Sequence, residues 1–333
     1  MTNRERVQAV LDGRKPDDRL PVLEWATWWD KTVCRWQKEK PGLPSEQHAL
    51  FDYFGLDQIY QFWFDPRARE FPEPAYHGAP RIHSEREFRD NLPFLFPEKQ
   101  LMDLKESLLK IKPMHDAGEI SIWFSLEGFF WFPRTLFGIE PHLFAFYDYP
   151  ELIHEMNRRL MEYHLKTLDA IYSVLTPEFM TFAEDMSYNH GPMLSKGCYD
   201  EFMRPYYDQV VPVIRSHGTK VLIDTDGDVQ PLIPWFRETG IQGVLPLERQ
   251  AGVDVNFIRE EYPEWIMIGG YDKTVMHLGE EAMRKEFERL LPAMKSGRYV
   301  PGVNHQTPPD VSLENYCIYL TLLNEYAQKA VQD

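Results

Sequence analysis

Short apolar runs recur along the whole chain, and each ends at or next to a polar or charged side chain. Their length and their content of β-branched and aromatic residues are typical of buried strands. The eight runs are Leu20–Trp25, Gln58–Phe64, Ile120–Leu126, Phe179–Ala183, Val221–Ile223, Gly243–Leu247, Trp265–Gly270 and Tyr299–Asn304. Most are followed by a helical pattern, which predicts parallel βαβ units.

Eight such units in 333 residues predict one α/β domain over residues 1–333, a (β/α)8 TIM barrel. A helix ending at Gly13 precedes the first strand, and further helices are expected over 149–175, 195–215, 280–293 and 313–331. The segment 67–97 is rich in proline and charge, so we expect an insertion at the barrel mouth. An open doubly wound sheet is the alternative architecture.

The composition and the absence of certain motifs exclude several classes of partner and cofactor. The net charge of −16 argues against nucleic acid and against an anionic membrane surface. No apolar run approaches the ~20 residues that span a bilayer, and the charged first residues predict no signal peptide. With 3 separated cysteines, a reducing cytoplasm is expected. No G-x-G-x-x-G, P-loop or G-x-S-x-G pattern occurs, so a nicotinamide, a flavin or a triad hydrolase has no support. An oligomer stays open.

Acidic residues crowd the end of the run Val221–Ile223, where Asp224, Asp226 and Asp228 follow. Asp224 and Asp226 share one side of an extended chain, and the ends of parallel strands meet at the barrel mouth. With His305, and with Glu248 at another strand end, they fit a divalent metal such as zinc. Without a metal, Asp224 or Asp226 fits a general acid or base whose pKa is raised by its acidic neighbours.

Other strand ends supply further candidates for catalysis and for binding a small molecule. Asp185 and Tyr188, just after the run Phe179–Ala183, are the additional catalytic candidates. Aromatic rings at strand ends can wall a pocket, although most such rings pack in the core. The substrate-binding candidates are Glu24, Trp28, Trp63, Glu127, Glu184 and Asn304.

A series of short motifs resembles the uroporphyrinogen decarboxylase superfamily in order and spacing. The motifs are Asp18-Arg19-Leu20-Pro21-Val22, Glu184-Asp185, Gly191-Pro192-Met193-Leu194-Ser195, Asp226-Gly227-Asp228, Pro246-Leu247-Glu248 and Gly269-Gly270-Tyr271-Asp272-Lys273. The resemblance implies a TIM barrel, in agreement with the strand count. It also implies one of two activities: decarboxylation of uroporphyrinogen without a cofactor, or methyl transfer to or from a corrinoid protein.

The chain departs from both patterns. The arginine-rich motif of the decarboxylases is replaced by Glu24-Trp25-Ala26-Thr27-Trp28-Trp29-Asp30, and an acidic mouth repels a substrate that carries many carboxylates. The methyltransferases commonly hold zinc with a His-x-Cys pair and a later Cys. In this chain Asp224 and Asp226 stand at the pair and His305 stands near the later position. Oxygen and nitrogen ligands still suit a divalent ion but favour thiol activation less.

The resemblance and the acidic mouth together predict a methyltransferase of the corrinoid-dependent demethylase type, acting on a small aromatic or cationic substrate. A cofactor-independent carboxy-lyase is the alternative, since Asp185, Tyr188 or Asp226 can protonate the carbon that loses carbon dioxide. A second alternative is a non-catalytic partner of a corrinoid protein.

Overall fold

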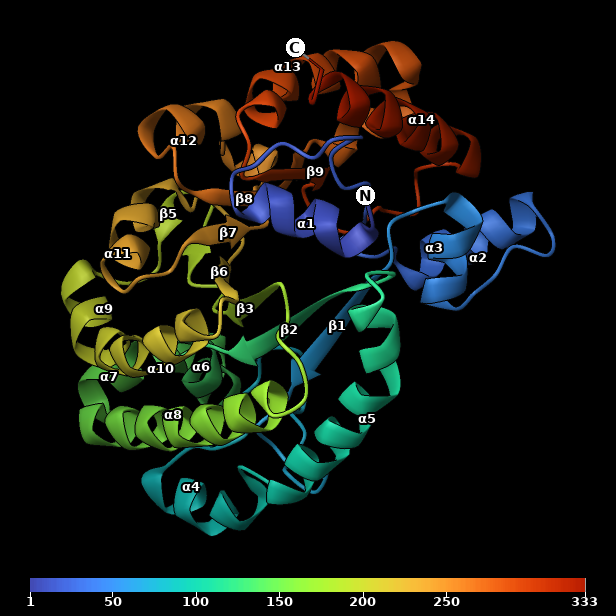
Figure 1. The fold of residues 1–333 in the computed structure, drawn as a ribbon. Coiled ribbons are helices and arrows are strands. Elements are labelled where there is room, and N and C mark those ends of the chain that lie inside the picture. Colours follow the sequence, from blue (N-terminus) through green and yellow to red (C-terminus); the bar gives the residue numbers. More distant parts are fainter. Residues whose placement is uncertain (333) are drawn as a thin grey trace.

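The computed structural model describes residues 1–332, and its centre is one curled sheet of parallel strands (Figure 1). The strands are β1 (Ile59–Phe64), β2 (Ser121–Glu127), β3 (Phe179–Ala183), β6 (Lys220–Asp224), β7 (Gly243–Leu245), β8 (Ile266–Tyr271) and β9 (Tyr299–Val303), hydrogen-bonded in that order. Seven of the eight predicted strands are therefore confirmed, with bounds that differ from the predicted ones by at most two residues. A small antiparallel hairpin, β4 (Ser187–Tyr188) and β5 (Gly191–Pro192), follows β3.

Helices surround the outer face of the sheet (Figure 1). They are α5 (Glu98–Asp116), α6 (Trp131–Phe137), α7 (Ile139–Asp148), α8 (Pro150–Tyr172), α9 (Lys196–Phe202), α10 (Arg204–Ser216), α11 (Ile233–Glu238), α12 (Val255–Glu261), α13 (Glu280–Lys295) and α14 (Leu313–Lys329). The helix expected over 195–215 is two helices, because Pro205 lies in the first turn of α10, where its missing N–H costs nothing. Strand side chains such as Phe124, Phe182 and Ile223 are fully buried.

The first predicted strand, Leu20–Trp25, is wrong, because this segment forms no sheet ladder. Pro21 has no N–H to donate, and the N–H of Val22 donates to the Asp57 carboxylate at 2.9 Å. The segment nevertheless lies between the two ends of the sheet: the Val22 carbonyl accepts from Asp57 N–H at 2.8 Å, and the Trp25 indole donates to the Val303 carbonyl at 2.8 Å. Within residues 1–332 the ladder thus has seven strands, and a complete eight-stranded barrel is not formed.

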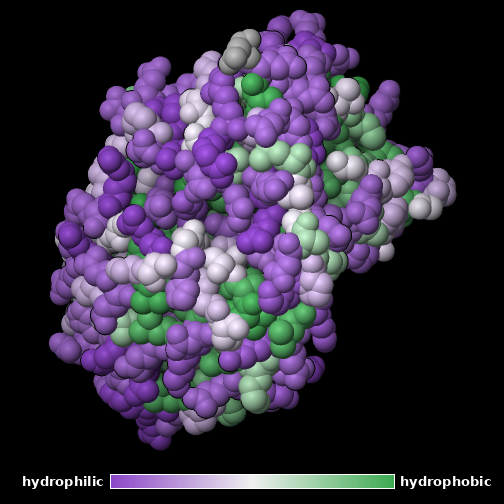
Figure 2. Space-filling view, viewed as in Figure 1, coloured by the Kyte–Doolittle hydropathy of each residue, from purple (hydrophilic) through white to green (hydrophobic). Residues whose placement is uncertain are grey.

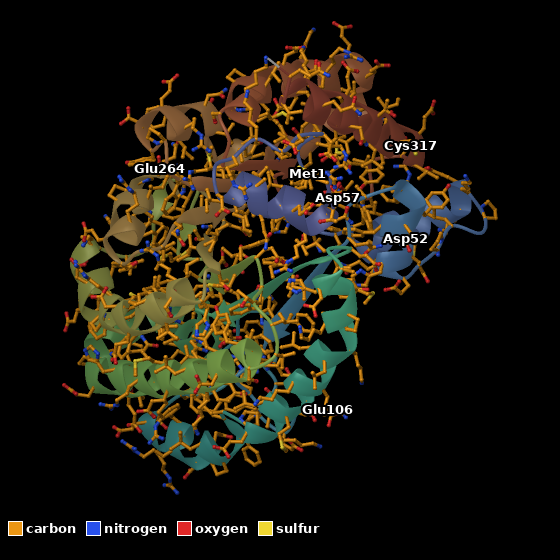
Figure 3. All side chains as sticks on the ribbon, viewed as in Figure 1. Met1, Asp52, Asp57, Glu106, Glu264 and Cys317 are labelled. Atoms are coloured by element: carbon orange, nitrogen blue, oxygen red, sulfur yellow. The ribbon has the colours of Figure 1, made fainter. Side chains whose placement is uncertain are left out.

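The N-terminal helix α1 (Asn3–Leu11) covers the amino ends of the strands and lies in front of the sheet in Figure 1. Its Arg6 forms ion pairs with Asp18 and with the buried Asp57, at 2.9 and 3.0 Å. Asp57 also accepts from Arg19, at 2.7 Å to each carboxylate oxygen. Figure 3 shows Asp57 close to Met1 at the start of this helix. The face that carries α1 is largely hydrophilic (Figure 2).

The segment 67–97 contains a short helix, α4 (Glu85–Asn91), which lies beside α8 (Figure 1). Arg89 of α4 pairs with Glu155 of α8 at 3.1 Å, and the base of the insertion is closed by a bridge between Arg67 and Leu95. A separate pair of helices, α2 (Asp30–Glu39) and α3 (Gln47–Phe54), packs beside α14. No helix within residues 1–332 is both long and apolar enough to span a bilayer.

Candidate active site at the carboxyl ends of the strands

A cavity of about 320 Å³ opens at the carboxyl ends of the strands, and we call it the mouth cavity. It is lined by Trp25, Ala26, Thr27, Gln47, His48, Gln61, Trp63, Trp123, Asp224, His305 and Gln306. Among the described residues that line it, none is Lys or Arg. Its titratable side chains are therefore one carboxyl group, that of Asp224, and two imidazoles, those of His48 and His305.

The register of the sheet explains why these side chains meet. Gln61 pairs with Trp123 across β1 and β2, and residues in register on parallel strands share a face. The same face carries Ser125 and Thr181, whose hydroxyl groups are 2.8 Å apart. The Gln61 amide donates to the Ser125 hydroxyl at 3.0 Å. This chain of hydrogen bonds crosses the three neighbouring strands β1, β2 and β3 on the face that carries the cavity-lining Gln61 and Trp123.

Asp224, the last residue of β6, places its carboxyl group at this cavity. Burial raises its pKa well above the usual value for aspartate, and the nearby charges of Asp226 and Asp185 raise it further. Within residues 1–332 the carboxyl group makes no hydrogen bond and no ion pair, so no cation stabilises its charged form. Burial and two neighbouring acids therefore favour the protonated form of the Asp224 carboxyl group.

Asp226 lies two residues further along, beside a second group of charges. Burial, followed by the charges of Glu248 and Asp185, raises the pKa of Asp226 to about 7, against the opposing effect of Lys273. Burial also lowers the pKa of Lys273. Asp226 is thus poised to gain or lose a proton near neutral pH, next to Asp224, whose pKa is also raised.

The loops after β3, β6 and β7 are joined by hydrogen bonds around Gly227. The N–H of Gly227 donates to Glu248 at 2.9 Å, and the Ser187 hydroxyl donates to the Asp226 carbonyl at 2.6 Å. Gly227 has a φ of +80°, and a Cβ there would lie 2.5 Å from the backbone of Tyr188. Only glycine combines that conformation with that approach.

His305, two residues after β9, also lines the cavity. Its Nδ1 accepts from the Gln306 N–H at 2.8 Å, so in the neutral ring the proton resides on Nε2. Nε2 lies 4.0 Å from Asp226 Oδ1, beyond direct hydrogen-bond distance. Burial, and then the charge of Lys273, lower the pKa of His305. The ring also packs edge-on against Trp25, with centroids 6.0 Å apart.

The four residues predicted as metal ligands, Asp224, Asp226, Glu248 and His305, occupy this region but do not converge. In the described part of the chain, no group of three or more His, Cys, Asp and Glu side chains is arranged to hold a metal ion. Glu248 accepts from a backbone amide, and the imidazole and the nearest carboxylate are 4.0 Å apart. The donor set as folded does not fit a bound divalent ion.

Glu184, predicted to bind substrate, is buried behind the sheet instead. Its carboxyl group accepts from the backbone N–H groups of Phe129, Phe130 and Trp131 at 2.8 to 2.9 Å, around the first turn of α6. Burial raises the pKa of Glu184 to about 8, although these three donors act in the opposite direction. A Cβ on Gly128 would lie 2.0 Å from the Glu184 carboxyl carbon. The group thus fixes the turn between β2 and α6.

Glu127, also predicted to bind substrate, is paired inside the protein. Its carboxylate forms two hydrogen bonds with the Arg67 guanidinium, one of them at 3.0 Å. Arg67 also contacts Asp65 at 2.8 Å and Thr135 at 2.6 Å. The pKa of Glu127 is raised to about 7 by burial, while Arg67 opposes the rise. This pair fastens the base of the insertion to the sheet.

Glu24 and Trp28 lie between the N-terminal segment and α14, away from the cavity wall. Glu24 accepts from the Tyr316 hydroxyl at 2.9 Å, and burial raises the pKa of Glu24 to about 8. Trp28 packs with Trp36, Phe51, Phe54 and Tyr316 in an aromatic cluster. The expectation that Trp28 walls the pocket is corrected, because the segment Asp30–Phe54 folds back over its ring.

The remaining predicted residues are split between the cavity and its surroundings. Trp63 lines the cavity and is 47% exposed. Asn304 is fully buried, donates to the Gln250 side chain and accepts from the Lys273 N–H at 3.3 Å. Asp185 pairs with Arg134 at 2.8 Å and has an unusual φ of +46°. Tyr188 is half-exposed in the β4–β5 hairpin.

Several cavity residues carry no sequence signal of their own. Gln61 lies in the middle of a strand, while Gln47 and His48 come from α3, a helix far from any strand end in the sequence. His48 is stacked on Tyr60, with ring centroids 3.8 Å apart, and its Nδ1 contacts the Gln58 side chain at 3.0 Å. Only the folding of α3 against β1 brings these groups to the cavity.

Comparisons with known proteins agree with this architecture. A methyltransferase from Methanosarcina mazei has a similar structure, with a TM-score of 0.66 over 98% of this chain and 99% of that one. The two sequences are 13% identical, so the likeness concerns the fold. Among the curated proteins, the uroporphyrinogen decarboxylases of Pseudomonas entomophila (strain L48) and Pseudomonas putida (strain F1) are each 24% identical over 188 residues.

Those alignments cover 54% of this chain and 50% of each relative, so the chain spans about half the length of the curated relatives it matches. The family model described as Uroporphyrinogen decarboxylase (URO-D) matches residues 137–326. That range contains Asp224, Asp226 and His305, whereas Gln61, Trp63 and Trp123 precede it. More than half of the chain is matched, and the protein therefore belongs to the uroporphyrinogen decarboxylase family.

Proposed function

We propose that this protein is a methyltransferase of the corrinoid-dependent demethylase type, in which Asp224 protonates the leaving group of a small substrate. The observation that carries the proposal is a carboxyl group that lines a cavity without any Lys or Arg and whose pKa is raised by burial. A carboxyl group with a raised pKa can serve as a proton donor.

The chemistry at Asp224 is a bond cleavage coupled to proton transfer. When a methyl group leaves an oxygen or nitrogen atom, the electron pair of the broken bond stays on that atom. When that atom is an ether oxygen or the nitrogen of a neutral amine, the proton of Asp224 neutralises the negative charge that develops there. The methyl group passes to an acceptor presented by a partner protein, for which a corrinoid is the candidate. Asp226, with its pKa of about 7, can return a proton to Asp224 for the next turnover.

The wall of the cavity favours a neutral or cationic substrate with a flat apolar part. Trp25, Trp63 and Trp123 supply indole rings, and aromatic rings attract both apolar surfaces and cations. A tetrapyrrole with many carboxylates would meet no lining cation, and the nearest acids would repel it. We propose that the segment Leu20–Trp25 takes the place of the eighth barrel strand and so completes this wall.

A carboxy-lyase is the second candidate, and the names of the Pseudomonas relatives favour it. In that reaction Asp224 would give its proton to the carbon that loses carbon dioxide. Both reactions need the same acid, but only methyl transfer needs a methyl acceptor.

The test is an activity screen of the full chain with free cob(I)alamin and a panel of methoxylated aromatic compounds and methylated amines. Methylcobalamin formation is followed by absorbance. D224N should lower the rate by about 10²-fold or more, as expected when a general acid is lost. D228N is the matched control, because Asp228 lies in the same loop but only accepts from Gln230.

An equal rate for D224N and the parent protein would contradict the role of Asp224. Carbon dioxide release from carboxylated analogues of the panel, without cob(I)alamin and dependent on Asp224, would assign the carboxy-lyase instead. Turnover that is absent under every condition, while a corrinoid protein binds the parent protein and D224N equally, would assign a non-catalytic partner.

A further inference from the structure

A second cavity, of about 230 Å³, lies between the insertion and α6, and we call it the insertion cavity. Pro74, Ala79 and Arg81 of the insertion form one wall, and Trp131 and Arg134 of α6 form the other. The backbone N–H of Arg81 donates to the Leu136 carbonyl at 2.8 Å, which holds the two walls together. The insertion cavity and the mouth cavity share no lining residue.

The net charge of the residues that line the insertion cavity is positive, whereas no Lys or Arg lines the mouth cavity. Its lining contains two arginines, Arg81 and Arg134, against one acid, Asp185, which leaves one positive charge in excess when His77 is neutral. Arg134 donates to Asp185 through Nη1 alone, at 2.8 Å to the carboxylate and 2.6 Å to the carbonyl. One guanidinium in the cavity thus has a partner with good geometry.

Arg81 has no such partner. Within residues 1–332 its single ion pair is to Glu73 at 3.5 Å, and the Glu73 side chain is 82% exposed. An exposed pair at that distance contributes little. Burial, and then the nearby charge of Arg67, lower the pKa of Arg81, while the charges of Glu73, Asp65 and Glu127 act in the opposite direction. Arg81 is only partly buried, and an anion that enters the cavity would give its guanidinium a closer partner than Glu73 does.

The other lining residues indicate what the uncharged part of that anion should look like. Four apolar side chains line the space around the arginines, those of Trp131, Ile139, Pro74 and Ala79. Arg134 stacks over Trp131, with its guanidinium carbon 5.0 Å from the ring centroid, so a flat surface is already present. The volume lies below the roughly 300 to 1,000 Å³ of drug-sized sites, which limits the ligand to a single ring with a short substituent.

We infer that the insertion cavity is a second binding site, for a small aromatic monocarboxylate, with Arg81 as the residue that binds its carboxylate. The single excess charge matches a monoanion, and a guanidinium binds a carboxylate in a planar, two-point arrangement. The site does not depend on the reaction proposed at Asp224. It is adjacent to that reaction, because Asp185 lines the insertion cavity and also raises the pKa values of Asp224 and Asp226.

The test uses isothermal titration of the full chain with benzoate and with benzamide, which have the same shape and differ in charge. Benzoate should bind at least tenfold more tightly than benzamide. R81Q should weaken benzoate at least tenfold and leave benzamide unchanged. R86Q is the matched control, because Arg86 is 90% exposed on α4, so this substitution removes the same charge without altering the cavity. R86Q should bind benzoate as tightly as the parent protein does.

A second variant keeps the test valid if R81Q does not fold. I139W places a large ring at the side of the cavity and should abolish the binding of both probes, whereas the thermal unfolding midpoint should stay close to that of the parent protein. Equal affinity for benzoate and benzamide, a loss of benzoate binding in R86Q equal to that in R81Q, or unchanged binding in I139W would each overturn the inference. So would the absence of benzoate binding at concentrations of about 10 mM, beyond the range of useful affinity.

Discussion

The replacement of Asp57 by asparagine tests how the N-terminal segment is fastened to the sheet. Asp57 is buried and accepts four hydrogen bonds: from Arg6 at 3.0 Å, from Arg19 twice at 2.7 Å, and from the Val22 N–H at 2.9 Å. In D57N one carboxylate oxygen becomes an NH₂ group, which faces arginine donors and cannot accept from them. The negative charge that compensates Arg6 and Arg19 disappears as well.

The expected cost follows from the burial of the pair. The side chains of Arg6 and Asp57 are only 9% and 4% exposed, so removal of one partner leaves a largely buried charge. Breaking such a pair costs about 3 to 5 kcal/mol. For a chain of 333 residues the entropy of unfolding is roughly 0.7 kcal/mol per degree near 60 °C, so the unfolding midpoint should fall by about 4 to 7 °C.

Thermal unfolding followed by circular dichroism measures this shift. D52N is the control, because Asp52 is exposed and accepts only from the Gln58 side chain; its free energy of unfolding should change by less than about 0.5 kcal/mol. Figure 3 labels both residues. A midpoint for D57N within about 1 °C of the parent protein would show that the segment Leu20–Trp25 is held by its packing and not by this ion pair.

Three further outcomes are expected from residues around the sheet. G128A should destabilise the protein by about 1 to 3 kcal/mol in denaturant unfolding, since its new methyl group would collide with the Glu184 carboxyl group; a neutral result would mean that the turn before α6 can shift. G197A, an exchange of the same size inside α9 where a Cβ meets nothing closer than 3.8 Å, should instead stabilise by about 0.5 to 1 kcal/mol. Folding raises the pKa of Glu24 to about 8, so between about pH 5 and 8 the native state binds a proton that the unfolded state has lost. The free energy of unfolding of the parent protein should therefore fall, relative to that of E24Q, by about 1.4 kcal/mol for each unit by which the pH rises in this range. A difference between E24Q and the parent that stays constant with pH would contradict this assignment.

Seven strands were predictable because each combines a short apolar run with an abrupt polar end. Such a pattern indicates that the run is buried, and it gives no information about the hydrogen-bond partners of the run. The segment Leu20–Trp25 shows the same pattern, but its hydrogen bonds depend on Pro21 and on the distant Asp57, and no local pattern reports them. The helical periodicity around Ser195–Arg215 predicted helix correctly, and Pro205 in the first turn of α10 marks where this stretch divides into two helices.

The site was predictable to the same degree. Asp224, Trp63 and His305 lie at the mouth cavity, as expected for residues near strand ends. Glu184 and Glu127 also follow strands, yet the first accepts from backbone amides and the second pairs with Arg67, a residue from an insertion. A carboxylate at the end of a strand can be used for structure or for chemistry, and its partners decide which. Those partners lie far away in the sequence.

The hydrogen bonds around Gly227 constrain one part of the cavity wall more than the rest. Because Gly227, Ser187 and Glu248 join three loops, a change in any one of them displaces the acids carried by the others. The opposite wall, which includes Thr27, Gln47 and Trp63, comes from parts of the chain that these bonds do not tie down. A library aimed at a new substrate should therefore vary that wall first, since none of these three positions takes part in the hydrogen bonds that link the loops of Asp226 and Glu248.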